Sequence, residues 1–214
     1  MKDYFRSQSI GANKRTRTRG LLLDSAIDVF SEKGIEEASI NEITAIAGLS
    51  NGTFYNHFKD KDELAAASSE AIALEIAKQL AEHMADLERG VSRLVVASWA
   101  FILIAHNAGA WAQVLVAQYQ RRASSPYSAF DYMRSDIELA VSQNDLQVAV
   151  DEFLLEQVAA LMMSALHRML NADAEVELPY RTCQHILRML GMTPKQAQRE
   201  VDRVAEYKLL KDLR

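Results

Sequence analysis

The sequence predicts an all-α protein: an N-terminal head of three helices with a helix-turn-helix, joined by a long fourth helix to a C-terminal helical bundle. Apolar residues recur at intervals of three and four along most of the chain, and capping residues precede these stretches. No segment shows the alternation of a strand. We expect a flexible basic arm over residues 1–13, the head over 14–60 and the bundle over 61–214.

The first helix of the head is predicted over residues 16–33, where Gly34 ends it. Its apolar side chains form one stripe, made of Leu23, Ala26, Ile27 and Phe30. A helix with one such stripe packs against neighbours on that face, so this helix is expected to support the two that follow.

Two further helix starts lie close together. Ser39 and Glu42 have the spacing of a capping box, so a helix begins near Ile40, and Gly48 supplies the positive φ that ends it. Ser50 then caps a third helix over residues 51–57. The spacing predicts a helix-turn-helix, which places its second helix in the DNA major groove. A plain helical hairpin that only packs in a bundle is the alternative.

The third helix separates its apolar and polar side chains. Phe54 and Phe58 lie on the inner side. Asparagine can bond a base edge with two hydrogen bonds, and hydroxyl groups can bond phosphate. The side chains left to solvent are of these kinds and include no acid: Asn51, Thr53, Tyr55 and Asn56.

The order of residues through this region resembles the signature of the tetracycline-repressor-like (TetR) family of bacterial transcription regulators. The matching positions are Ile43, Ala47-Gly48-Leu49-Ser50, Gly52, Tyr55, His57-Phe58, Lys59, Lys61 and Leu64. Thr44 departs from the pattern, which usually has alanine there, and we expect the small position to accommodate it without loss of function. The resemblance covers the head alone.

The resemblance implies a homodimer that binds a pseudopalindromic operator in double-stranded DNA. It implies contacts to bases from Asn51, Gly52 and Tyr55, and contacts to phosphates from Thr53, Asn56, His57 and Lys61. Arg17 and Arg19 join this set on charge alone, and Ser39 completes the DNA-binding candidates.

The charge is distributed unevenly. The whole chain carries −5, but residues 1–23 hold six basic residues against Asp3, which leaves −10 for the remainder. A basic arm can reach phosphates while an acidic bundle stays away from DNA. For residues 1–13 we favour a solvated, disordered tail over a DNA-binding arm.

Seven helices are predicted for the bundle, over residues 61–87, 91–105, 110–122, 126–142, 148–170, 179–190 and 194–210. No charged residue lies between Arg93 and Arg121, but polar residues interrupt that stretch, so it predicts two buried helices and not a membrane span. The single cysteine, Cys183, and the absence of a signal-peptide pattern indicate the cytoplasm, which the resemblance implies is that of a bacterium.

Large apolar side chains with a few polar groups in the bundle suggest a pocket for a small, largely apolar effector. Each of them could equally be plain core. The candidates are Trp99, His106, Asn107, Trp111, Tyr119, Phe130, Met133, Met162 and His167. The helices over 148–170 and 179–190 are the expected dimer interface, through Leu155, Val158, Met162, Leu166, Ile186 and Leu190.

Enzymatic function is not expected. The five histidines show no metal-ligand spacing, and no nucleophile elbow, catalytic triad or phosphate-binding glycine loop is present. We therefore predict no catalytic residue, metal or cofactor. The sequence predicts a transcriptional regulator, in particular a repressor released by its effector. The alternatives are a DNA binder whose bundle docks a protein, or a helical-bundle enzyme or carrier.

Overall fold

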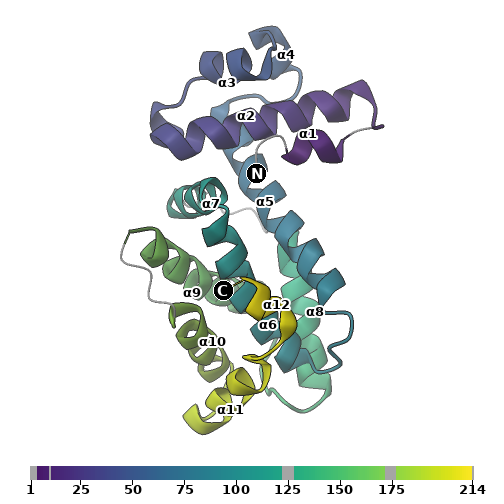
Figure 1. Cartoon of the computed structure of the whole chain (residues 1–214), viewed down its shortest axis with the longest axis vertical. Helices are drawn as coiled ribbons and strands as arrows, with labels where there is room; N and C mark the ends of the chain where they lie inside the picture. Colours follow the sequence, from purple (N-terminus) through teal and green to yellow (C-terminus); the bar gives the residue numbers. More distant parts are fainter. Residues whose placement is uncertain (1–3, 10, 122–127, 172–176, 214) are drawn as a thin grey trace. The chain divides into compact units, whose positions relative to one another are not determined.

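The computed structural model describes residues 4–9, 11–121, 128–171 and 177–213, and these contain helices and no strand. This confirms the predicted all-α class. The helices labelled in Figure 1 are α1 (Tyr4–Gln8), α2 (Lys14–Glu37), α3 (Ile40–Ala47), α4 (Asn51–Tyr55), α5 (Lys61–His83), α6 (Gly90–Asn107), α7 (Ala110–Gln120), α8 (Ala129–Ser142), α9 (Glu152–Asn171), α10 (Leu178–Met189), α11 (Pro194–Val204) and α12 (Lys208–Leu213).

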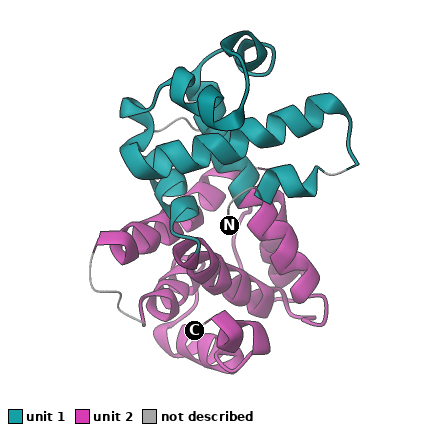
Figure 2. Cartoon of the chain, turned by 45° about the horizontal axis from the view of Figure 1, so that its top comes forward, with its two compact units in different colours: residues 1–72, 108–124 teal, residues 73–107, 125–214 magenta. Residues whose placement is uncertain are grey.

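The chain folds as two compact units, coloured separately in Figure 2. The first comprises residues 1–72 and 108–124, and the second comprises 73–107 and 125–214. Helix α5 therefore begins in the first unit and ends in the second. The sequence placed the boundary near residue 60 and assigned α7 to the bundle. The structure differs because α7 packs along α2, a contact between segments about ninety residues apart.

Helix α2 is the centre of the first unit. Its side chains Leu22, Ala26 and Phe30 are buried, and α3 and α4 lie over it, as Figure 1 shows. Ile43 of α3 and Phe54 of α4 are fully buried. Gly34 adopts φ 80° and interrupts α2 where the sequence predicted the helix to end.

Residues 4–8 form a helix held on α2, so the expected flexible arm is not what the structure shows for this segment. Two consecutive backbone N–H groups of α1 donate to the two carboxylate oxygens of Asp24, at 3.0 and 2.8 Å. A Cβ on Gly20 would lie 2.8 Å from the carbonyl oxygen of Phe5, so glycine permits the close approach. The ring of Phe5 also stacks on Trp111, 5.9 Å between centroids. Both partners are distant in sequence.

Helix α6 is the centre of the second unit, because most of its residues are buried and α8 to α12 all contact it. Gly90 lets α6 and α8 approach closely, since a Cβ there would lie 2.5 Å from the carbonyl oxygen of Asp136. The Arg93 guanidinium donates from Nε to the Asp136 carboxylate at 2.6 Å. This ion pair joins the same two helices.

Two predicted bundle helices differ from their expected limits, and one predicted cap is not described. Helix α9 begins at Glu152, four residues later than expected. The helix predicted over 194–210 divides into α11 and α12, and in the turn between them the Tyr207 hydroxyl donates to the Asp86 carboxylate at 2.6 Å. The N-cap predicted at Ser125-Pro126 lies outside the described residues.

Helices α6 and α9 are each long and apolar enough to pass a length-and-composition test for a membrane span, which core helices of soluble proteins also pass. The α6 stretch is 67% buried inside the fold, as expected of a core helix. The α9 stretch is only 39% buried, and apart from Phe153 its exposed positions carry polar side chains.

Candidate nucleic-acid interface

The turn between α3 and α4 is built by the caps that the sequence predicts. The Ser39 hydroxyl accepts from the Glu42 N–H at 3.2 Å, and the Ser39 N–H donates to the Glu42 carboxylate at 3.1 Å. Gly48 ends α3 with φ 66°. The Ser50 hydroxyl then accepts from the Thr53 N–H at 3.2 Å and starts α4. The cap uses both polar groups of Ser39, so this residue supports the start of α3, and a DNA contact from it stays a prediction.

One side of helix α4 packs in the head, and the opposite side is exposed to solvent. Phe54 is fully buried, with its ring 6.0 Å from that of Phe58. On the opposite face Tyr55 is 58% exposed, and Asn56 is also exposed. A Cβ on Gly52 would meet only the Ser50 hydroxyl, at 3.8 Å, so packing within the chain does not require glycine there. The missing side chain leaves the start of α4 open to a ligand.

Lys61, which the resemblance places at a DNA phosphate, bonds within the chain in this structure. Its ammonium group donates to the carbonyl oxygens of Glu36 and Ala38, at 2.6 and 2.7 Å. Lys61 therefore caps the C-terminal end of α2 and ties it to α5, a favourable use of a cation. The contact spans more than twenty residues, so no local pattern indicates it.

Asn51 is exposed, but its amide is already bonded within the head. The carbonyl oxygen accepts from the Thr44 hydroxyl at 2.8 Å, and the amide nitrogen donates to the Asn41 side-chain oxygen at 2.6 Å. Thr44 itself is 2% exposed. The residue that departs from the family pattern thus contacts a residue expected to read bases.

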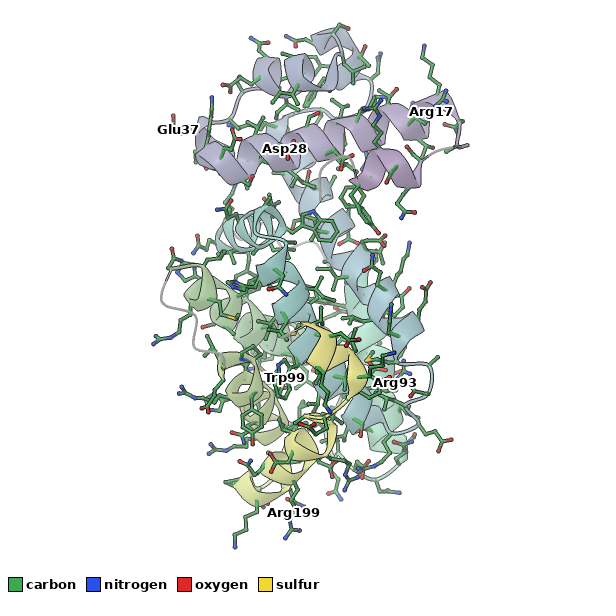
Figure 3. The ribbon with its side chains drawn as sticks, in the orientation of Figure 1. Arg17, Asp28, Glu37, Arg93, Trp99 and Arg199 are labelled. Carbon is green, nitrogen blue, oxygen red and sulfur yellow. The ribbon has the colours of Figure 1, made fainter. Side chains whose placement is uncertain are left out.

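Basic side chains gather on the N-terminal half of α2. Lys14, Arg15, Arg17 and Arg19 are exposed there, and Figure 3 shows Arg17 projecting away from the ribbon. The Arg19 guanidinium lies 4.4 Å from the centre of the Phe58 ring, a cation–π contact that holds it beside the segment following α4. Arg15 was not among the predicted DNA-binding residues, although its spacing of four residues from Arg19 places both on one face of the helix.

His57 is half-buried next to these arginines. Burial lowers the pKa of His57 from its usual range, and the charges of Arg15 and Arg19 lower it further. The lowered pKa favours the neutral imidazole. The surface is rich in positive charge before any ligand arrives, as a phosphate-binding surface requires.

The effector candidates do not form one set. Trp111 and Tyr119 lie on α7 in the first unit, where Trp111 packs on Tyr4 and Phe5 and Tyr119 is 41% exposed. The remaining candidates lie in the second unit: Trp99, His106, Asn107, Phe130, Met133, Met162 and His167.

Within the second unit the candidates also differ in burial. Trp99 and Met162 are 3% and 5% exposed, and the Trp99 ring packs edge-on against Tyr180. His167 is exposed, so it does not line an interior pocket. The Nδ1 atom of His106 is buried and has no hydrogen-bond partner in the described structure. Gln118 of α7 was not among the predicted residues. Its side-chain oxygen is also buried and has no hydrogen-bond partner in the described structure.

The expected dimer interface is not available on the surface. All six of its residues are between 0% and 5% exposed within a single chain: Leu155, Val158, Met162, Leu166, Ile186 and Leu190. The helical stripe was read correctly as apolar, but it packs into the core of the second unit, because α6 and α10 cover it. An interface on these helices would have to use their outer faces.

Comparison with known proteins assigns the head. Residues 22–68 match the family described as bacterial regulatory proteins, tetR family. The chain is 41% identical over 69 residues to the uncharacterized HTH-type transcriptional regulator YvdT of Bacillus subtilis, and 45% identical over 47 residues to the HTH-type transcriptional regulator AcrR of Shigella flexneri. These matches cover 32% and 22% of this chain, and 31% and 22% of the relatives' lengths.

Solved structures share the fold over most of the chain. RolR in complex with the ligand resorcinol has a TM-score of 0.64 at 21% identity, covering 89% of this chain and 95% of that one. A putative tetR family transcription regulator from Shewanella sp. PV-4 has a TM-score of 0.67 at 12% identity, covering 82% and 99%. At these identities the likeness extends the fold assignment, and not the function, to the bundle.

Proposed function

We propose that this chain, which belongs to the TetR family of bacterial regulatory proteins, is a sequence-specific DNA-binding transcriptional regulator of the bacterial cytoplasm. It acts as a homodimer on a pseudopalindromic operator, as a repressor released by a small, largely apolar effector. We assign it no catalytic role.

The face of α4 carries this proposal. Phe54 fixes the helix to the head, while Tyr55 and Asn56 project from the opposite side and Gly52 leaves the backbone accessible. Arg15 and Arg19 add positive charge beside it. Polar side chains that can read base edges, flanked by cations that bind phosphates, are what major-groove recognition needs.

Replacing Tyr55 with alanine tests the assignment. Loss of one contact to a base or phosphate typically costs ~1–3 kcal/mol of binding free energy, so operator affinity should fall by roughly 5- to 150-fold. Because Tyr55 is 58% exposed, the Tyr55→Ala protein should unfold at nearly the same temperature as wild type. Affinity is measured by fluorescence anisotropy on an operator selected from random DNA. Tyr55→Phe separates the ring from the hydroxyl. An unchanged operator affinity of the Tyr55→Ala protein would contradict the assignment of α4 to the DNA interface.

His57 should make operator binding dependent on pH. Its pKa is lowered in the free protein, and a DNA phosphate nearby would raise it, so the complex takes up a proton in the pH window between the two values. Operator affinity should therefore fall as pH rises through that window. The total fall is about tenfold for each unit by which the pKa of His57 in the complex exceeds its pKa in the free protein. His57→Gln should flatten the dependence, whereas replacement of the exposed His185 of α10 should leave it intact. Equal slopes in all three proteins would contradict this role.

An effector site in the second unit is supported by its chemistry. Trp99 and Met162 supply apolar surface, and the buried Nδ1 of His106 lacks a partner that a ligand hydroxyl or carbonyl could provide. Among the similar folds, RolR is a complex with resorcinol and another is a gamma-butyrolactone receptor. Resorcinol and gamma-butyrolactone are both small ring compounds with few polar groups. Mass spectrometry of material that co-purifies with the chain identifies the compound class directly.

We infer that the homodimer forms through the outer face of α9. This helix has a mean hydropathy of 1.2 over its most apolar stretch, yet that stretch is only 39% buried within one chain. Phe153 at its start is 66% exposed. The outer stripe continues through the small residues Ala160 and Ser164, which allow two helices to approach closely. Charged residues also lie on the exposed sides of both helices, Glu156 and Arg168 on α9 and Arg181 and Arg188 on α10.

A further inference from the structure

We propose that Thr44 determines operator specificity without touching DNA, by holding the Asn51 side chain in one orientation. The proposal rests on the proposed DNA-binding function. It concerns a polar network within the first unit that joins α3 to the first residue of α4.

The network begins at a buried hydroxyl. Thr44 is 2% exposed, and its Oγ1 lies 2.9 Å from the Ile40 carbonyl oxygen, 3.1 Å from the Asn41 carbonyl oxygen and 2.8 Å from Asn51 Oδ1. All four atoms belong to two helices held by the caps at Ser39 and Ser50. A hydroxyl has one proton, and all three neighbours are acceptor oxygens, so it donates to one of them at a time. The contact to Asn51 Oδ1 is the shortest of the three, and in this arrangement the proton goes to the Asn51 amide.

A second contact holds the other end of the amide. Asn51 Nδ2 donates to Asn41 Oδ1 at 2.6 Å, and Asn41 lies three residues before Thr44 on α3. While the Thr44 hydroxyl donates to Asn51 Oδ1, rotation of the amide by 180° would break this bond and the bond to Asn41. An asparagine without these contacts can present its donor and acceptor in either order.

The remaining bonding capacity of Asn51 suits a base. An amide has two N–H donors and two lone pairs on oxygen, so the bonds to Thr44 and Asn41 leave one donor and one acceptor. Because Asn51 is exposed at the start of α4, these are open to a ligand. A two-bond contact to adenine needs one of each. Thr44 therefore acts as a positioning residue, and Asn51 makes the contact.

Removal of the hydroxyl tests the idea. Thr44→Val keeps the shape of the buried side chain and removes both hydrogen-bonding functions, whereas Thr44→Ser restores the hydroxyl. Wild type first selects its preferred sites from random double-stranded DNA. The affinity of each variant is then measured for the selected site and for all single-base changes in one half-site.

Thr44→Val should lose about tenfold of discrimination at one base pair, and Asn51→Ala should lose it at the same base pair. The double variant should match Asn51→Ala, because Thr44 acts only through that side chain. Thr44→Ser should discriminate like wild type. Thermal unfolding confirms that each variant is folded.

Each other outcome decides against the proposal. A purely structural role for Thr44 would weaken binding to all sites equally and leave the ratios unchanged. Discrimination by Thr44→Val equal to wild type would show that Asn51 needs no support. If wild type selects no sequence at all, the proposed function fails, and the role of Thr44 fails with it.

Discussion

Replacing Ser164 with glutamate should convert the dimer into monomers and reduce operator affinity by at least 100-fold. Ser164 is exposed on the outer face of α9, so a carboxylate there is harmless in a single chain. In a two-fold dimer built on this face, the same stripe of both chains meets, and two unpaired charges are buried together. Removing water from such charges costs several kcal/mol. A monomer also loses the second half-site, and with it most of the binding free energy.

Light scattering gives the oligomeric state, and anisotropy gives the operator affinity. The matched control is Ser135→Glu, since Ser135 is an exposed serine on α8. It should remain a dimer with wild-type affinity. A Ser164→Glu protein that stays dimeric would show that the interface lies on another face. The outer side of α10 would then be tested next. Charging Leu166 would not distinguish these cases, because it is fully buried and the change would unfold the chain.

The second large effect concerns the ion pair between α6 and α8. Asp136 is 4% exposed and accepts from Arg93 Nε at 2.6 Å, while Arg93 also donates to the Met84 carbonyl oxygen at 3.0 Å. Removing one partner of a buried pair leaves a charge without compensation and typically costs about 3–5 kcal/mol. Asp136→Asn and Arg93→Met should each lower the free energy of unfolding by about that much, as measured by urea denaturation. The double variant Arg93→Met/Asp136→Leu should recover most of the loss.

The two single variants should differ in their pH dependence. Burial raises the pKa of Asp136 above its usual value, although Arg93 opposes the shift. An acid whose pKa is higher in the folded state binds more protons there, so stability rises as pH falls from that value toward about 4. In Arg93→Met the opposing charge is gone, and acidification should relieve the loss. Asp136→Asn has no carboxyl to protonate. Parallel pH profiles for the two would show that Asp136 does not titrate in this window.

Local patterns predicted the helix-turn-helix in detail. The Ser39 capping box, the positive φ of Gly48 and the Ser50 cap were all expected and are all confirmed. The inward position of Phe54 was also predicted, since helical periodicity separates it from Tyr55. Each of these features depends on residues within four positions of one another, so the sequence states them directly.

The contacts that were not predicted depend on tertiary packing. Lys61 was expected at a phosphate and instead caps α2 at Glu36 and Ala38. Thr44 was expected to be accommodated, and its bond to Asn51 was not foreseen. A motif gives the type of side chain at each position, but the neighbour that a long side chain reaches depends on how helices are placed in space.

The sequence by itself therefore determined the all-α class, the helical caps of the head and which helix faces are apolar. Only the tertiary structure decided that α1 packs on α2, that α7 belongs to the first unit, and that Leu155 and Leu166 lie in the core of the second unit. The physical reason is that hydrophobic burial has no direction along the chain. An apolar stripe must be covered, and its covering surface can come from any element that packing brings against it.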